Sequence, residues 1–197
     1  MRTETTTREL FTFDELSDKA KETAISRNRE WNTEHNEWWD GTVRDFVNIA
    51  KLMGIETDCS LIQFSGFSSQ GDGASFTGQW ECAPGGGAAV RDYAPADTDL
   101  HEIADTLAGF AGVRGQLVRR NSNYSHANTV DVDCTDAETG YPVADEVERE
   151  VTHGLRGLMD WLYRTLEKES EYLESDEQVA ESLHANNCEF TADGTDA

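Results

Sequence analysis

A single apolar stripe near the C-terminus constrains the fold of this chain more than any other feature. Between residues 144 and 173 the apolar side chains recur every three or four positions, the repeat that places them on one face of an α-helix. Pro142 precedes this segment, and proline is compatible with the approach to a helix. The stripe consists of Val147, Val151, Leu155, Leu158, Leu162 and Leu166. This pattern predicts a long C-terminal helix whose apolar face must be buried against other elements.

Four shorter helices are also predicted. Residues 18–33, 38–53 and 98–111 carry apolar side chains at helical spacing. Gly54 follows the second of these segments, and glycine favours the left-handed conformation that ends a helix. Ser175 begins a pattern typical of a capping box, which predicts a short last helix. An aromatic cluster near the junction of the first two helices predicts a core that they share. This cluster consists of Trp31, Trp38 and Trp39.

Two β-hairpins are predicted between these helices. The first covers residues 60–82 and turns at residues 71–73, and the second joins residues 116–118 to residues 129–133. The glycine-rich residues 83–87 are expected to form a flexible connection. The order of elements predicts an α+β fold, in which an antiparallel sheet of two β-hairpins, about four strands, packs against four to five helices including the long C-terminal helix.

The length of 197 residues predicts a single α+β domain over residues 1–197, with flexible ends at residues 1–11 and 192–197. No segment approaches the roughly 18 to 20 apolar residues that span a bilayer. The first ten residues lack the apolar block of a secretory signal. We therefore expect a cytoplasmic protein that does not engage a membrane.

The charge of the chain limits its partners. There are 39 acidic and 16 basic residues, and the formal net charge is −23 at pH 7. Nucleic-acid binding draws its affinity from Lys and Arg, so direct binding to DNA or RNA is disfavoured. Residues 145–197 alone carry 15 acidic and 4 basic residues. A solvated surface, adaptation to a high-salt cytoplasm, and an acidic face that imitates nucleic-acid phosphates all remain open as explanations.

No arrangement of residues in the sequence predicts catalysis. The five histidines are scattered, and the sequence contains neither a GxSxG elbow, nor a phosphate-binding glycine loop, nor an HExxH pair. Asp131 and Asp133 alternate with valines, which favours the solvated side of a strand over a cation site. We therefore expect a protein that is not an enzyme and that binds neither a metal nor a cofactor.

The tip of the first hairpin is the most unusual local feature, because it combines glycines with many hydrogen-bonding groups. Its residues fit a bulged turn, in which Gly and Ser are required for the backbone. They also fit a contact site for a ligand or partner, with two residues of the second hairpin alongside. The candidate ligand-binding residues are Ser65, Phe67, Gln70, Asp72, Tyr124 and His126.

Four segments resemble one uncharacterised phage and prophage family, whose members are often labelled as an antitoxin of a toxin-antitoxin stability system. These segments are FTFDELSDKAKETA (11–24), NEWWD (36–40), IQFSGFSSQGDGASFTG (62–78) and YLESDEQVAESLHANNCEFTADG (172–194). The resemblance implies a phage-encoded protein that stays in the cytoplasm of the host cell and works by binding something there. It assigns no catalytic residues.

Three roles are compatible with this resemblance and with the charge. In the first, the protein docks an acidic face on a basic, nucleic-acid-binding surface of a host toxin or defence protein, as a nucleic-acid mimic would. In the second, the two hairpins bind a small ligand such as a nucleotide signal. In the third, the protein is a virion or housekeeping component with a salt-adapted surface. The residues predicted for the acidic face are Glu146, Glu150, Glu167, Glu171, Glu174 and Glu177.

Overall fold

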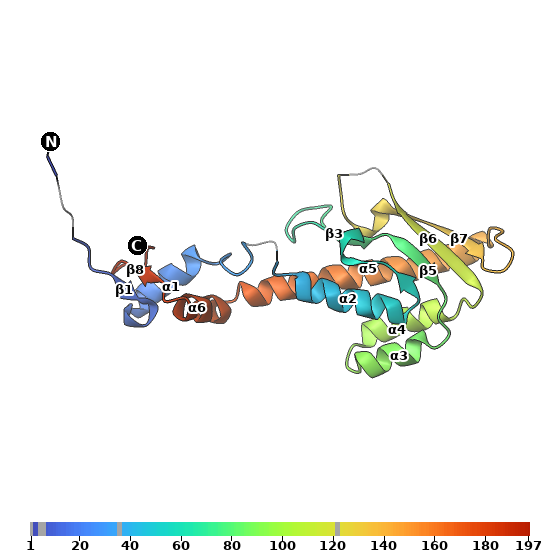
Figure 1. The fold of residues 1–197 in the computed structure, drawn as a ribbon, viewed down its shortest axis with the longest axis horizontal. Coiled ribbons are helices and arrows are strands. Elements are labelled where there is room, and N and C mark those ends of the chain that lie inside the picture. The colour runs from blue at the N-terminus through green and yellow to red at the C-terminus, as the bar shows by residue number, and fades with distance from the viewer. Residues whose placement is uncertain (1, 4–6, 35–36, 121–122) are drawn as a thin grey trace. The chain divides into compact units, whose positions relative to one another are not determined.

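The computed structural model describes residues 2–3, 7–34, 37–120 and 123–197. The chain divides into two compact units (Figure 1). The smaller unit contains residues 1–38 and 168–197, and the larger unit contains residues 39–167. The organisation as a single domain with flexible ends stays a prediction. None of the helices in the described residues combines the length and the apolar character needed to cross a lipid bilayer.

The smaller unit is built from a short strand pair and two helices. β1 (Phe11–Thr12) pairs with β8 (Glu189–Phe190) in antiparallel orientation. α1 (Asp18–Arg27) contacts α6 (Asp176–Ala185). The core of this unit contains Phe13, Leu16, Ala20, Ala24, Val179, Leu183 and Phe190.

The helix ends in the smaller unit follow local side-chain chemistry. The Ser175 hydroxyl accepts a hydrogen bond from the backbone N–H of Gln178 at 3.4 Å, which confirms the predicted cap of the last helix. α1 ends before the predicted residue 33, because the Asn28 side chain donates to the carbonyl of Ala24 at 2.9 Å and competes with the backbone. Trp31 is 41% exposed, so the prediction that it belongs to a core is wrong.

The larger unit contains a four-stranded antiparallel sheet in the order β2-β5-β6-β7. A separate two-stranded sheet pairs β3 with β4. The bounds of these strands are β2 (Ile55–Glu56), β3 (Ile62–Phe64), β4 (Ala74–Phe76), β5 (Gly78–Glu81), β6 (Val113–Arg119) and β7 (Val130–Asp136). A four-stranded antiparallel sheet was predicted, and the structure contains one.

The strands that form this sheet differ from the predicted ones. The hairpin of β6 and β7 contributes both of its strands, as expected. The first predicted hairpin is divided instead: β3 and β4 pair with each other, and the chain then leaves this pair at Gly78, whose φ is +143°. β5 begins there and pairs with β2 and β6. The sheet is therefore completed by the short strand β2, which follows α2.

Four helices accompany the sheet in the larger unit. They are α2 (Asp40–Leu52), α3 (Gly86–Tyr93), α4 (Thr98–Ala108) and the part of α5 (Asp145–Leu173) up to residue 167. α5 confirms the predicted long C-terminal helix. Leu155, Leu158 and Leu162 of its apolar stripe are completely buried. Figure 1 shows α5 running along the strands of the sheet.

The glycine-rich segment 83–87 forms the predicted connection only in part, because residues 83–85 lie in a turn and the last two residues belong to a helix. Gly86 and Gly87 begin α3 and are buried. A Cβ atom at Gly86 would lie 2.8 Å from the carbonyl oxygen of Leu52, so only glycine allows α3 to approach the end of α2 this closely. Tertiary packing therefore overrides the poor helix propensity of glycine at this position.

Side chains of α5 cover the outer edge of β7. The Glu148 carboxylate accepts a hydrogen bond from the backbone N–H of Cys134 at 3.0 Å. The Arg156 guanidinium donates to the carbonyl oxygen of Val130 at 3.3 Å. The backbone N–H of Val143, ahead of α5, donates to the carbonyl of Cys134 at 3.3 Å. The Val130 carbonyl and both backbone groups of Cys134 thus have partners on the side of β7 away from β6.

Candidate functional site

The loop between β3 and β4 is held in shape by its own side chains. The Asp72 carboxylate accepts hydrogen bonds from the backbone N–H groups of Ser68 at 3.1 Å and Ser69 at 2.7 Å. The Ser65 hydroxyl accepts a hydrogen bond from the backbone N–H of Gly73 at 3.1 Å. Ser65 and Asp72 are two of the candidate ligand-binding residues. Their side chains therefore stabilise the turn through hydrogen bonds to its backbone.

Phe67 and Gln70 lie in different surroundings within this loop. The Phe67 ring stacks on Phe64 at a centroid distance of 6.2 Å and packs against Tyr163 of α5 at 5.4 Å. The Tyr163 hydroxyl donates to the carbonyl of Gly66 at 3.1 Å, which fixes the loop to α5. Gln70 is exposed. The loop thus has one face packed on the helix and one face open to solvent.

The structure brings Tyr124 and His126 against the same loop. A Cβ atom at Gly71 would lie 3.0 Å from the Tyr124 ring, and one at Gly73 would lie 2.4 Å from the Cβ atom of His126. The rings of Tyr124 and His126 are 5.9 Å apart between centroids. We call Ser65, Phe67, Gln70, Asp72, Tyr124 and His126 the hairpin-tip cluster. Its members share one region, and their binding of a ligand stays a prediction.

Tyr163 is a member of this region that the sequence did not reveal. Burial raises the pKa of its hydroxyl above the ordinary value, and the negative charges of Glu167 and Asp72 add to that shift. A protonated hydroxyl remains a hydrogen-bond donor, as the contact with Gly66 requires. In the sequence, only the position of Tyr163 could have pointed to this role: it lies on the polar side of the long helix, three residues before Leu166.

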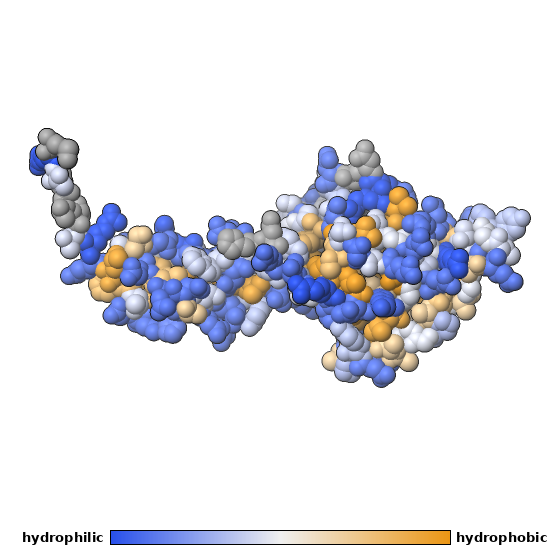
Figure 2. All heavy atoms as spheres, in the orientation of Figure 1, coloured by the Kyte–Doolittle hydropathy of each residue, from blue (hydrophilic) through white to orange (hydrophobic). Residues whose placement is uncertain are grey.

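The residues predicted for the acidic face divide between the two units. Glu146, Glu150 and Glu167 belong to the larger unit, and Glu171, Glu174 and Glu177 belong to the smaller one. The carboxylates of Glu146, Glu150, Glu171 and Glu177 are exposed. Glu174 is occupied, because its Oε1 accepts hydrogen bonds from the hydroxyls of Thr33 at 2.9 Å and Ser170 at 3.3 Å. Figure 2 shows hydrophilic residues over most of the visible surface.

Basic residues interrupt the acidic row in the middle of α5. With 3.6 residues per turn, the positions between Glu150 and Glu167 that share their side of the helix include three basic side chains and one carboxylate, that of Asp160. The basic residues between them on this side are His153, Arg156 and Arg164, and Arg149 lies just before Glu150. The outer side of α5 therefore carries carboxylates at Glu146 and Glu150 and again at Glu167, with basic residues between these positions. That these carboxylates form one binding face stays a prediction.

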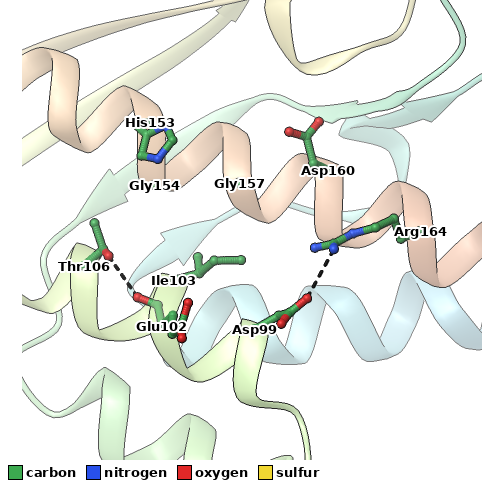
Figure 3. Close-up of a pocket in the computed structure, with 9 residues that line it drawn as sticks. All are labelled: Asp99, Glu102, Ile103, Thr106, His153, Gly154, Gly157, Asp160 and Arg164. Atoms are coloured by element: carbon green, nitrogen blue, oxygen red, sulfur yellow. Dashed lines mark hydrogen bonds and ion pairs between the residues drawn. The ribbon is translucent and has the colours of Figure 1, made fainter.

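A hollow of about 620 Å³ lies between α4 and this part of α5 (Figure 3). Arg164 points toward Asp99 of α4, and the two form an ion pair at 3.2 Å. The Asp160 carboxylate points away from this pair. Burial raises the pKa of the Asp160 carboxyl above its ordinary value by desolvation. Nearby basic groups act in the opposite direction and lower this pKa; they are Arg164, His126, Arg156 and His153. The sequence already places opposite charges four residues apart on this helix, at Arg156, Asp160 and Arg164. This spacing brings their side chains close together on one side of the helix.

A family model described as "Domain of unknown function (DUF8835)" matches residues 38–176. The matched segment includes the whole larger unit, with the hairpin-tip cluster and the basic middle of α5. No curated protein and no solved structure matches the chain.

Proposed function

Because the chain belongs to the DUF8835 family of domains of unknown function, we propose its role from its own surface chemistry. The protein is a non-enzymatic binding protein that docks exposed carboxylates on a basic surface of another protein. The observation that carries this proposal is that Glu146, Glu150, Glu171 and Glu177 are exposed and form no ion pair within the described residues. Their charge is available to a partner.

Unpaired surface carboxylates act over several ångströms of solvent. They attract a basic partner before contact and accelerate association, and salt screens this attraction. We assign the docking to two separate groups, which we call the early patch (Glu146 and Glu150) and the late patch (Glu171 and Glu177). The resemblance to an antitoxin-labelled phage family supports a toxin or defence protein of the host as the partner, with its nucleic-acid-binding surface as the basic side.

Charge-neutral variants of the two patches should separate their contributions. Glu146→Gln with Glu150→Gln, or Glu171→Gln with Glu177→Gln, should slow association with the partner by about tenfold at low salt for the patch that makes contact. The difference from the unmodified protein should shrink at high salt. The partner is recovered from host lysate at low and high salt, and association rates are then measured with the purified pair.

A control variant with Asp133→Asn and Glu138→Gln removes two exposed charges elsewhere on the larger unit. It should leave association nearly unchanged. An equal loss of association rate in this control would mean that the total charge of the protein, and neither patch in particular, accelerates association.

Recovery of no basic partner at low salt would show that the docking role is wrong. Normal function of both patch variants in the host would instead favour a virion or housekeeping role with a salt-adapted surface.

A second candidate function is the binding of a small ligand, for instance a nucleotide, at the hairpin-tip cluster. It is favoured by the approach of Tyr124 and His126 to the loop and by the 57% exposure of Tyr124. A nucleotide at about 100 times its dissociation constant should add about 2.7 kcal/mol to the free energy of unfolding. Thermal-shift measurements with a set of nucleotides test this. Tyr124→Ala should remove the shift, whereas Val118→Ala, at a 50% exposed position of β6, should not.

A further inference from the structure

The four-stranded sheet of the larger unit has one buried face and one exposed, polar face. Leu117 of β6 and Val132 of β7 lie opposite each other and are buried. Their neighbours along the strands, Gln116 and Asp133, point to the other face and are exposed. A hollow of about 480 Å³ lies on this exposed face, and residues of all four strands line it. The hollow is therefore a feature of the sheet itself.

One row of side chains crosses the hollow from strand to strand. Glu56 of β2 lies opposite Gln79 of β5. Gln79 lies opposite Gln116 of β6, which in turn lies opposite Asp133 of β7. Directly opposed residues share one face of a sheet, and all four of these side chains are exposed and line the hollow. We call them the cross-strand row, which has a carboxylate at each end and two amides between.

The cross-strand row presents hydrogen-bond acceptors. The Gln116 Nε2 atom donates to the carbonyl of Gly78 at 3.1 Å, which leaves the Oε1 atom of the same amide for another donor. Gln79 carries a second amide oxygen beside it. Ionised carboxylates accept hydrogen bonds and donate none. The row therefore suits a ligand that brings several donors.

The charge of the hollow is negative and lies at the two ends of the row. Glu56 and Asp133 form no ion pair within the described residues. The other charged residues that line the hollow are Glu81 and Arg114, and they pair with each other at 2.7 Å. Two carboxylates thus remain uncompensated, and a ligand with a positive charge at each end would compensate both.

The spacing of the row excludes a shared metal ion and favours an elongated ligand. Neighbouring strands lie about 4.8 Å apart, so the two ends of the row are about 14 Å apart. Carboxylates that far apart cannot both ligate one cation, because its bonds to oxygen are about 2.0 to 2.6 Å long. In a linear polyamine the protonated nitrogens are separated by three or four methylene groups, which is about 5 to 6 Å in an extended chain. Its charges therefore recur at nearly the strand spacing.

We propose that this hollow binds a linear polyamine that lies across the four strands. The terminal ammonium groups pair with Glu56 and Asp133, and the inner ammonium groups donate to the amide oxygens of Gln79 and Gln116. A tetraamine such as spermine matches the row both in length and in its number of nitrogens. The site takes a small cation on the sheet, so it is separate from the early and late patches and goes beyond the docking of those patches on a basic protein.

Calorimetric titration of the full chain with spermine, spermidine and putrescine at one moderate ionic strength tests the site. One spermine should bind per chain, and putrescine, which reaches across a single interval between strands, should bind at least about tenfold more weakly, with spermidine in between. Glu56→Gln combined with Asp133→Asn should weaken spermine binding by about tenfold or more, because both terminal ion pairs are lost.

Gln116→Leu tests the middle of the row without changing the charge. It removes an amide acceptor and should weaken spermine binding by about threefold or more. Unchanged spermine affinity in this variant would contradict the contact with the inner ammonium groups. Gln116, Glu56 and Asp133 are all exposed, so their replacement should leave the sheet folded. Circular dichroism of each variant checks this.

Glu146→Gln combined with Glu150→Gln is the matched control, since it also removes two exposed carboxylates but from α5. It should change the affinity for spermine by less than about twofold. An equal loss in this control would overturn the assignment to the cross-strand row. Absence of saturable binding up to about 1 mM spermine would overturn the site itself. Equal affinity for spermine and putrescine would overturn the placement of the ligand across the strands.

Discussion

Replacement of Trp80 with alanine should lower the free energy of unfolding of the larger unit by about 4 kcal/mol. Trp80 lies in β5, between β2 and β6, and is 1% exposed. Its indole Nε1–H donates to the carbonyl of Met53 at 3.1 Å, at the end of α2 where helix carbonyls lack partners. The variant therefore leaves a cavity and a buried unpaired carbonyl. Urea denaturation followed by circular dichroism measures the loss.

Trp80→Phe separates the two contributions. It keeps most of the buried apolar area, removes the hydrogen bond and leaves a smaller cavity than alanine does, so it should cost about 1 to 3 kcal/mol. Trp31→Ala is the surface control in the smaller unit, and at 41% exposure it should cost less than about 1 kcal/mol. A loss below about 1 kcal/mol for Trp80→Ala would contradict the role of this side chain in the core.

Replacement of Gly54 with alanine should cost about 3 kcal/mol or more. Gly54 has a φ of +81° and lies between α2 and β2. A Cβ atom there would lie 2.0 Å from the carbonyl oxygen of Glu81, whose own N–H donates to the Gly54 carbonyl at 2.9 Å. The side chain would strain the backbone conformation and also push β5 away. Equilibrium unfolding in urea again gives the difference.

Gly112→Ala provides a closely matched comparison. Gly112 has a φ of +80°, and a Cβ atom there would have no neighbour within 4 Å. This variant should therefore show only the conformational cost, about 1 kcal/mol. The excess loss at Gly54 measures the close approach of β5. Equal losses in the two variants would show that no such contact resists the added atom.

The parts of the fold that sequence could predict are those governed by local repeats. The stripe through Leu155, Leu158 and Leu162 depends only on the periodicity of a helix, and the structure buries all three. The Ser175 cap and the left-handed Gly54 are likewise decided by neighbouring atoms. Such features are visible in a sequence because their physical cause lies within a few residues.

The parts that sequence could not predict depend on distant partners. Ile55–Glu56 is too short to show strand alternation, yet it pairs with β5 and completes the sheet. Gly86 disfavours a helix by propensity, and α3 forms there because glycine fits against the carbonyl of Leu52. In both places tertiary contacts outweigh local preference, and those contacts become visible only once the chain is folded.

The candidate sites show the same division. The loop of Asp72 could be singled out from its composition, but its approach to Tyr124 and His126 required the structure. The charge count over residues 145–197 did not show where Arg149 and Arg156 lie among the acidic residues. A count gives only the number of charges and not the side of the helix on which each one lies. The acidic stretch suggested by sequence is accordingly interrupted by a basic one.

The covered edge of β7 limits the ways in which another protein can bind here. A strand arriving at this edge would need free N–H and C=O groups, and Glu148 and Val143 already bond the N–H and C=O of Cys134, while Arg156 bonds the C=O of Val130. Extension of the sheet by a foreign strand, or by a second copy in an aggregate, is thereby disfavoured at this position. Recognition on this side must proceed through side chains, which depends on charge and shape and leaves the sheet intact.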